Sequence, residues 1–299
     1  MNCPYLTTYK ENQMYAITGI TGRVGGAVAR NLLSKNQSVR AVVRDANKGT
    51  AWADRGCTVA VAEMNDADAL TAAFADAEGV FVMIPPNFAP SPGFGEAHGF
   101  VAALHTAIAA AHPGKVVCLS TIGAQSNQPT VLTQLQIMEQ EFGDLPMPIA
   151  FLRAAWFMEN AAWDVAPAKE KGLIPSFMQP LDKPVPMIAT ADVGRIAAEL
   201  LQQTWSGRRI VEIEGLHRVT PNDLAQSFSK LLGRSVQAEA VPHATWEALF
   251  KAQGNVNPQP HIRMLDGFNE GWVEFEGGES GSMKGEVELE TVLKDLVKQ

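Results

Sequence analysis

Short β-branched runs alternate with alanine-rich segments of helical periodicity along the first half of the chain. The runs lie at residues 14–18, 38–43, 57–62, 79–84 and 115–120, and the periodic segments at 22–35, 66–76 and 96–112. Short apolar runs are typical of buried strands, and strands that alternate with helices form βαβ units. The pattern therefore predicts an α/β fold: a Rossmann-like, doubly wound parallel sheet with helices on both faces.

The alternation continues past the midpoint and then becomes irregular. A helix at about 129–143 and a strand at 148–153 extend the series, whereas five prolines crowd residues 167–186. A helix at 189–203 and a strand at 208–215 restore the alternation. The remaining elements that we expect are helices at 220–233 and 243–254, a short strand at 235–242, a glycine-rich loop at 276–286 and a final helix.

These changes in pattern predict three parts. Residues 1–13 are a polar N-terminal extension. The Rossmann domain takes residues 14–153 and is rejoined by about 189–215. A smaller C-terminal α+β lobe, which would shape a substrate or partner site, takes residues 154–188 and 216–299.

Composition narrows the classes of function. The chain has 24 basic and 32 acidic residues, a net charge of −8, which disfavours binding to the phosphates of nucleic acids. No apolar run has the length of a membrane span, and residues 1–13 lack the apolar core of a signal peptide. Cys57 and Cys118 stand in apolar runs, and Cys3 has no partner at metal-ligand spacing, so we expect small buried thiols in a reducing cytoplasm.

Three histidines recur every seven residues along one predicted helix: His98, His105 and His112. Heptad spacing separates neighbours by ~10 Å along the helix axis, too far to share a metal ion. We expect a half-exposed stripe and no metal site.

A glycine loop joins the first strand to the first helix. Gly19 permits the tight turn, Gly22 lets the backbone approach a pyrophosphate, and Gly25 allows close packing of helix on strand. The helix N-terminus presents free N–H groups and a positive dipole end to phosphates. These three glycines are therefore predicted to bind a dinucleotide together with Thr21, Arg23 and Val24.

Residues at the end of the second strand indicate which dinucleotide binds. NAD-selective folds usually place an acidic residue there, whereas this chain has Arg44, with Lys48 one turn later and Arg23 in the glycine loop. Cationic side chains suit a 2′-phosphate, so NADP(H) is favoured over NAD(H). Asp45 leaves an alternative open, because it can pair with Arg44 or reach a ribose.

The ends of the next strands supply the other candidate cofactor residues. Glu63 and Met64 follow the third strand, where adenine packs, and Asp66 is expected to cap the next helix. The loop at 84–96, beginning with Ile84 and Pro85, either folds over a substrate or is a plain connection. At the end of the fifth strand, Ser120 and Thr121 either contact the nicotinamide ribose or substrate, or are satisfied strand-end hydroxyls.

The combination of "TGITGRVGG", "VVR" and "LSTIGA" resembles the short-chain dehydrogenase/reductase superfamily. "FLRAAWFMEN" (151–160) and "ATADVGRIAAELL" (189–201) resemble its atypical, NmrA-like branch. The resemblance implies a Rossmann-like domain that binds NADP(H) and a small C-terminal domain that closes a cleft. Members of this branch include quinone and triphenylmethane-dye reductases and redox-sensing regulators.

The superfamily's enzymes carry Tyr-x-x-x-Lys on the helix after the fifth strand, where the phenol acts as general acid/base. The corresponding segment, 129–142, contains neither residue. Aligning Glu139 and "FLR" with the family places Val131 and Leu135 roughly at the two sites. Carbonyl chemistry by that dyad is therefore excluded.

Aromatic residues after the sixth strand are the candidate acceptor pocket. Trp156, Phe157 and Asn160 lie where the resemblance places the nicotinamide and substrate, with Phe88 from the loop and the amide of Gln134 nearby. Some rings belong to the core instead, and Trp163 is the first such candidate.

Three functions remain in order of preference, and the last, a dinucleotide-binding scaffold for oligomerisation or assembly, has no specific sequence feature in its favour. The first is an NADPH-dependent reductase of a flat conjugated acceptor such as a quinone, which is already electrophilic and can take its proton from water. The second is a non-catalytic NADP(H) redox sensor that acts through a protein partner. Whether the chain forms a homo-oligomer stays open.

Overall fold

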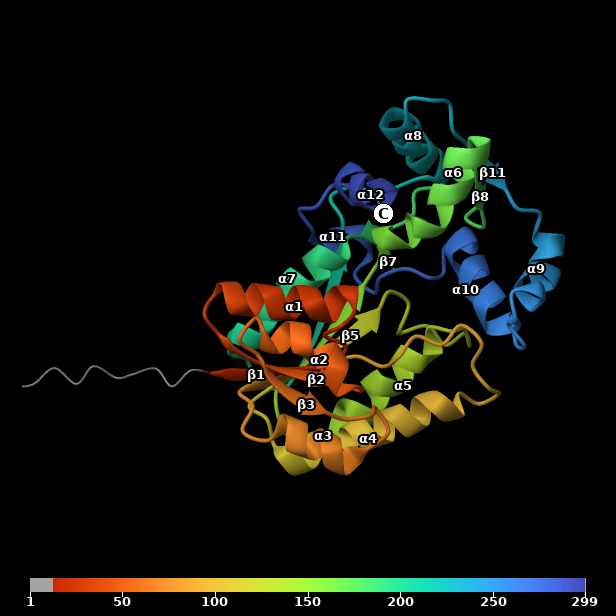
Figure 1. The fold of residues 1–299 in the computed structure, drawn as a ribbon. Coiled ribbons are helices and arrows are strands. Elements are labelled where there is room, and N and C mark those ends of the chain that lie inside the picture. The colour runs from red at the N-terminus through yellow and green to blue at the C-terminus, as the bar shows by residue number, and fades with distance from the viewer. Residues whose placement is uncertain (1–12, 299) are drawn as a thin grey trace, which may run out of the picture.

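The computed structural model describes residues 13–298. Within them, a single eight-stranded sheet has the order β12-β10-β6-β5-β4-β1-β2-β3 and is parallel throughout (Figure 1). Its strands are β1 (Met14–Ile17), β2 (Ser38–Val43), β3 (Thr58–Val61), β4 (Gly79–Val82), β5 (Val116–Thr121), β6 (Ile149–Ala154), β10 (Arg208–Glu214) and β12 (Met283–Lys284). The predicted Rossmann-like fold is confirmed. The expected extension falls outside the described residues, apart from its last residue, Gln13.

Helices cover both faces of the sheet. The connecting helices are α1 (Arg23–Ser34), α2 (Ala46–Ala53), α3 (Ala67–Phe74), α4 (Gly95–Ala111), α5 (Thr133–Glu141) with the 3-10 turn η1 (Phe142–Asp144), and α7 (Thr190–Gln202). One face carries α1 packed on α7, and the other carries α3, α4 and α5 side by side (Figure 1). The α1–α7 crossing is close because Gly194 has no side chain: a Cβ there would lie 2.3 Å from Ala27 Cβ.

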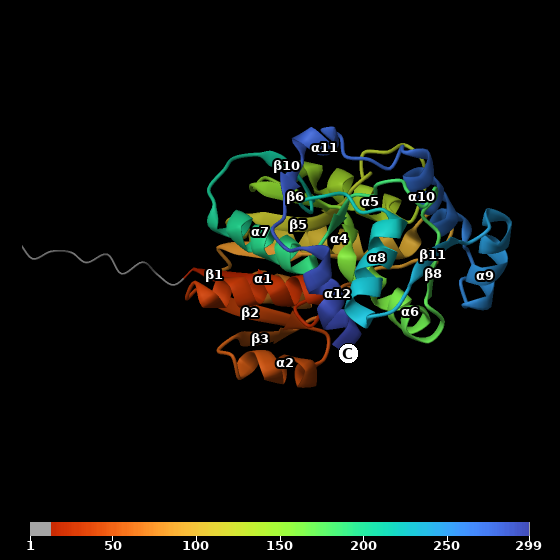
Figure 2. The ribbon, with the colours of Figure 1, turned by 90° about the horizontal axis from the view of Figure 1, so that it is seen from above.

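A smaller lobe follows β6. Its elements are β7 (Trp156–Phe157), η2 (Met158–Asp164), α6 (Val165–Lys171), β8 (Leu173–Ser176), β9 (Met187–Ile188), α8 (Pro221–Leu232), β11 (Gln237–Ala240), η3 (His243–Thr245), α9 (Trp246–Ala252), α10 (Gln259–Glu270), α11 (Gly278–Gly281) and α12 (Leu289–Lys298). The final helix, α12, packs against α8 and η2 (Figure 2). A separate apolar cluster forms there, with Phe228 and Leu293 fully buried.

The segment at 276–286, expected to be a loop, is more ordered than its glycines suggest. It contains α11 and the two-residue strand β12, which pairs with β10 at the edge of the main sheet. Long-range hydrogen bonds hold it: Gly285 N donates to Glu214 O at 2.7 Å, and Asp192 Oδ2 accepts from Glu286 N and Val287 N. Part of the C-terminal segment assigned to the lobe therefore completes the Rossmann sheet.

The predicted histidine stripe links helices. His98 Nδ1 lies 2.7 Å from Glu141 Oε1, and His105 Nε2 lies 2.9 Å from Asp144 Oδ1, so both residues join α4 to α5 and η1. Cys57 and Cys118 are buried as expected, and burial raises the pKa of both thiols. Cys3 lies outside the described residues. Among residues 13–298, no helix is both long and apolar enough to cross a membrane.

Candidate functional site

The loop between β1 and α1 is packed so tightly that its glycines cannot be replaced without movement. Gly19 has a φ of +61°, and a Cβ there would lie 2.5 Å from Met83 Sδ. A Cβ on Gly25 would lie 2.4 Å from Gly19 O and 2.8 Å from Thr18 O, both backbone atoms. The backbone at the start of α1 therefore rests directly on the turn before it.

The N-terminus of α1 has no side-chain cap. Its N-cap residue is Gly22, which has extended backbone and no side chain to accept from the first turn. The first N–H groups of a helix lack intrahelical acceptors, so this end favours an anion. Thr21, Gly22 and Arg23 are exposed beside it, whereas Val24 is buried and anchors the turn.

The cationic residues predicted to read a 2′-phosphate lie at the end of β2. Arg44 and Lys48 are exposed, as is Arg23 in the glycine loop. Asp45 is used locally: its Oδ1 accepts from Asn47 N at 2.9 Å and caps α2. The ribose alternative for Asp45 loses support, because capping accounts for its position.

Next along this sheet edge, Glu63 is exposed while Met64 and Ile84 are buried and Pro85 is half-buried. Asp66 caps α3 by accepting from Ala69 N at 3.0 Å, as predicted.

The hydroxyl of Ser120 is already satisfied. Its Oγ donates to Glu139 Oε1 at 2.5 Å, and the side chain is buried. Of the two interpretations that the sequence left open, the structure shows the satisfied strand-end hydroxyl. Thr121, one residue further, is half-buried, and its Oγ1 donates to Ile122 O at 3.2 Å.

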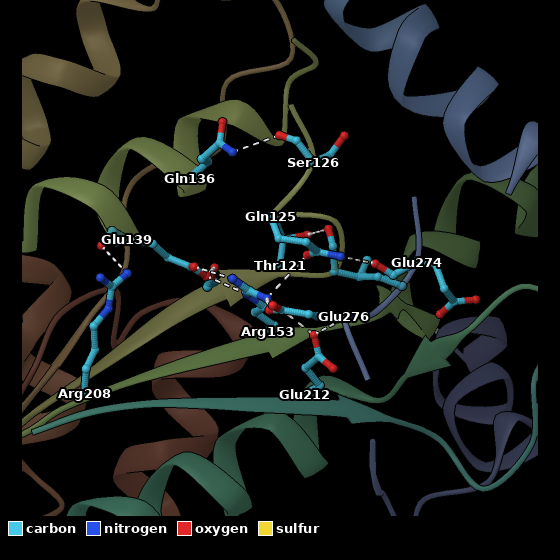
Figure 3. A network of polar contacts seen from close by, with 12 residues as sticks. Thr121, Gln125, Ser126, Gln136, Glu139, Arg153, Arg208, Glu212, Glu274 and Glu276 are labelled. Atoms are coloured by element: carbon cyan, nitrogen blue, oxygen red, sulfur yellow. Dashed lines mark hydrogen bonds and ion pairs between the residues drawn. The ribbon is translucent and has the colours of Figure 1, made fainter. Parts of the chain in front are cut away.

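A buried ion network fixes the ends of β5, β6 and β10 (Figure 3). Arg153 donates to both carboxylate oxygens of Glu139, at 2.9 and 2.7 Å, and its Nη1 lies 2.9 Å from Glu276 Oε2 and 3.5 Å from Glu212 Oε1. Burial lowers the pKa of Arg153, but its bonds to Glu139 and Glu276 outweigh burial, so the pKa is raised.

The same network anchors the chain after α10. Glu212 accepts from Glu276 N at 2.8 Å and from Gly277 N at 2.9 Å, and Gln125 Nε2 donates to Glu274 O at 2.7 Å (Figure 3). Sequence reasoning used Glu139 and "FLR" only as alignment marks and missed their pairing. The available signal was an arginine inside an apolar strand, since a buried charge requires a partner.

The helix after β5, where the resemblance to short-chain dehydrogenases would place a Tyr-Lys dyad, contains neither tyrosine nor lysine. α5 reads "TQLQIMEQE" and begins at Thr133, four residues later than predicted. Val131 is buried in the turn before it, and Leu135 packs against the core. Tyr15 is buried in the core, with its hydroxyl bonded to Gln13. Tyr5 and Tyr9 lie outside the described residues.

A cavity of about 640 Å³ is lined almost entirely by the lobe, with Phe88 contributed by the loop after β4. Four of the predicted pocket residues line it: Phe88, Trp156, Phe157 and Asn160. Trp156 packs edge-on against Phe268, with ring centroids 5.6 Å apart. The cavity is lined predominantly by apolar and aromatic side chains, as small-molecule sites usually are.

Gln134 has a different place from the one predicted. It is buried, and its Nε2 donates to Asn87 O and Val131 O, both at 2.8 Å. The amide therefore holds the loop after β4 instead of facing the cavity.

The loop after β4 contributes to the cavity and is tied to the lobe. Asn255 Nδ2 donates to Phe88 O at 2.9 Å, and Asn257 Nδ2 donates to Pro90 O at 2.8 Å. These two amides fix the loop to the chain after α9. It is therefore a wall of the cavity and more than a plain connection.

Trp163 does not belong to the core. Its side chain is 66% exposed and lines the cavity, so the expectation of burial was wrong. It lies near the end of η2, a short 3-10 helix whose buried residues are Met158 and Ala161. Spacing in such a short helix does not reveal which side faces the protein.

Several lining residues come from segments that the sequence did not connect to the site. His261 stacks on Phe250 with ring centroids 4.5 Å apart, and Phe250 stacks on Phe177 at 5.2 Å. Burial lowers the pKa of His261 to about 4 and raises that of Asp164, also in the lining, to about 7. Local sequence patterns give no signal for this group, because it is assembled by the packing of α9 on α10 and on Phe177, the residue after β8.

Comparison with known proteins agrees with this architecture. A sequence model of the NmrA-like family matches residues 11–271. The chain belongs to the NmrA-like family.

Two curated relatives and one solved structure of the same architecture are informative. An NAD(P)H azoreductase from Xenophilus azovorans is 26% identical over 230 residues, covering 76% of this chain and 77% of the relative. Quinone oxidoreductase 2 from Escherichia coli (strain K12) is 25% identical over 247 residues, covering 81% and 82%. The crystal structure of an NADPH-dependent quinone oxidoreductase from Escherichia coli, in complex with NADPH, superposes with a TM-score of 0.79 at 22% identity, over 95% of this chain and 99% of that chain.

Proposed function

We propose that this NmrA-like protein binds NADP(H) in preference to NAD(H) and transfers a hydride from NADPH to a flat conjugated acceptor, of the quinone or azo class. The observation that carries the proposal is the placement of an aromatic cavity at the sheet edge that bears the glycine loop. Phe88 follows β4 and Trp156 follows β6, and the glycine loop follows β1, the strand next to β4 in the same parallel sheet. Ligands of doubly wound folds bind at the carboxyl ends of the strands.

The residues at this edge fit a dinucleotide. Gly19, Gly22 and Gly25 let the turn and the start of α1 pack closely without side chains, and the uncapped N-terminus of α1 suits a pyrophosphate. Arg44, Lys48 and Arg23 would hold the 2′-phosphate. Glu63 and Met64 would flank the adenine, with Ile84, Pro85 and Thr121 toward the nicotinamide. Ser120 would support this region indirectly through Glu139, because its hydroxyl is bonded to that carboxylate.

When bound, NADPH supplies the hydride. The protein's own contribution is positioning: Trp156 and Phe157 offer ring faces and edges to a flat acceptor, and Phe88 closes one side. Because α5 carries neither tyrosine nor lysine, the proposed reaction proceeds without a Tyr-Lys dyad. A reduced quinone or azo acceptor then takes its proton from water.

The curated relatives support the class of acceptor, since one is named as an azoreductase and the other as a quinone oxidoreductase. The test is a titration of the cofactor-free protein with NADPH and NADH, followed by addition of quinones and azo dyes while nicotinamide absorbance is recorded. We expect tighter binding of NADPH and its oxidation by at least one acceptor class. Tight binding without oxidation by any acceptor would instead support the sensor function.

A further inference from the structure

The charge of the cavity lining is unusually simple. Of the residues that line it, only Asp164 and His261 are titratable; the described lining contains no lysine or arginine. Its other polar members are neutral: Asn160, Ser176, Gln253 and Asn255. A bound molecule therefore meets at most one negative charge and no fixed positive charge within the cavity.

Asp164 is the last residue of η2 and precedes α6. It lines the cavity without capping that helix. Within the described residues no hydrogen bond or ion pair engages its carboxylate, and burial alone raises its pKa, to about 7. A carboxylate that faces an apolar cavity without a partner is available to a ligand.

Charged groups on the elements that pack against η2 are engaged elsewhere or lie in solvent. On α6, Lys169 Nζ donates to Val297 O at 2.8 Å. On α12, Lys298 pairs with Asp295 at 3.6 Å. On α8, which packs on α6, Lys230 pairs with Glu290 of α12 at 3.8 Å, and Asp223 closes the capping box of that helix. The other charged side chains of α6 and α12 are exposed: Glu170, Lys171 and Lys294. On η2 itself, Glu159 accepts from Thr190 N and Oγ1.

His261, at the other titratable position, stays neutral. Its ring stacks on Phe250 and lies 5.3 Å from the Phe88 ring centroid, and burial lowers its pKa to about 4. It therefore adds no positive charge above about pH 5 that would offset Asp164.

We propose that Asp164 sets the charge preference of the acceptor cavity: conjugated acceptors with a cationic substituent bind best, neutral ones bind less tightly, and sulfonated or carboxylated ones bind least tightly. The carboxylate pairs with the cationic substituent while the aromatic walls hold the flat core. The preference for cations is full at pH 8, where Asp164 is ionised, and weakens as pH falls through neutrality. This inference rests on the proposed function, because it names the acceptor class of the same cavity.

The test uses three dyes with one azobenzene core that carries a dimethylamino group on one ring and, on the other, a trimethylammonium group, hydrogen or a sulfonate. Their binding to the protein saturated with NADP⁺ is measured by equilibrium dialysis at pH 6 and pH 8, without turnover. In low-dielectric surroundings a single carboxylate is expected to favour the cationic dye over the sulfonate by ~10-fold or more at pH 8. The ratio falls at pH 6 as the carboxyl group takes up a proton.

Asp164→Asn removes the charge and keeps the shape of the side chain. It should bring the ratio of the affinities for the cationic and the sulfonated dye to about 1 at both pH values. Asp164→Glu keeps the charge and should keep the ratio, which separates charge from misfolding. Glu170→Gln, an exposed change on the adjacent helix, should leave it unaltered. Equal binding of the sulfonate and the cation at pH 8, or an unchanged ratio in Asp164→Asn, would overturn the inference.

Comparing dye binding with NADPH oxidation distinguishes failure of the proposed function from failure of this inference. If the dyes show the charge ratio but none oxidises NADPH, the cavity assignment stands and the reductase does not. If the neutral dye is reduced and charge has no effect on binding, the reductase stands and the role of Asp164 is refuted.

Discussion

Replacing Gly25 by alanine tests the close approach of α1 to the glycine loop. The new Cβ would lie 2.4 Å from Gly19 O, whereas real Cβ atoms essentially never come within 3.0 Å of another atom. The helix start and the turn must therefore separate by about 0.6 Å. Gly19 O and Thr18 O, the two oxygens that the Cβ would approach, belong to the backbone, so no side-chain rotation relieves the contacts.

The magnitude follows from two effects. Overpacking at a tight backbone contact lowers the free energy of unfolding by about 1–3 kcal/mol. The same movement displaces N–H donors at the N-terminus of α1, and each hydrogen bond lost to a charged phosphate weakens binding by about 1.5–3 kcal/mol. Loss of one such bond raises the Kd for NADPH by roughly 10- to 100-fold.

The assay is isothermal titration with NADPH together with urea denaturation. Gly26→Ala is the matched control on the same helix, because its Cβ would lie 3.1 Å from Ile20 O and from the mobile end of Arg30. We expect the Kd of Gly26→Ala for NADPH to change by less than about threefold. The higher helix propensity of alanine should offset the mild crowding in the free energy of unfolding. Wild-type affinity and stability in Gly25→Ala would refute this account of the loop.

Three further predictions concern single side chains. Arg44→Ala should raise the Kd for NADPH by about tenfold and leave that for NADH nearly unchanged, as measured by paired titrations; equal losses for both cofactors would contradict a 2′-phosphate role. Arg153→Met should lower the free energy of unfolding in urea by about 3–5 kcal/mol, because it leaves two buried glutamates without a cationic partner; a change below about 1 kcal/mol would show that water reaches them. Asp164 has a pKa of about 7 when folded, above its ordinary value of 3.8, so the folded state binds more protons between these values and stability falls as pH rises through that window. The free energy of unfolding should fall by about 4 kcal/mol between acidic pH and pH 8, and Asp164→Asn should remove this fall. Urea denaturation of both proteins across this pH range measures it, and parallel pH profiles for the wild type and the variant would refute the burial of this carboxyl group.

Local periodicity was sufficient to predict the sheet from β1 to β6. Buried parallel strands need apolar residues on both faces, so each appears as a short apolar run between amphipathic helices. β12 could not be predicted in this way. It has only two residues and lies in a glycine-rich segment. Its position depends on the hydrogen bond that Gly285 N donates to Glu214 O and on the carboxylate of Asp192, and both of these acceptors are distant in sequence.

The candidate site was predictable where it follows strand ends and not where it depends on lobe packing. Phe88, Trp156 and Phe157 follow strands of the main sheet, and all three line the cavity. Trp163 was misjudged because exposure in a short 3-10 helix is set by tertiary contacts. His261 was missed because its stacking on Phe250 depends on how α9 and α10 pack together.

The measurement that tests the central claim most directly is an anaerobic single turnover. The protein is mixed with NADPH deuterated at the transferred position and with a quinone, and the loss of nicotinamide absorbance is compared with that for unlabelled NADPH. Hydride transfer within the aromatic cavity predicts oxidation well above the protein-free rate, slowed about twofold or more by deuterium when chemistry is rate-limiting, and strongly reduced by Trp156→Ala at unchanged NADPH affinity. Tight NADPH binding with oxidation no faster than without protein, across quinone and azo acceptors, would contradict the account.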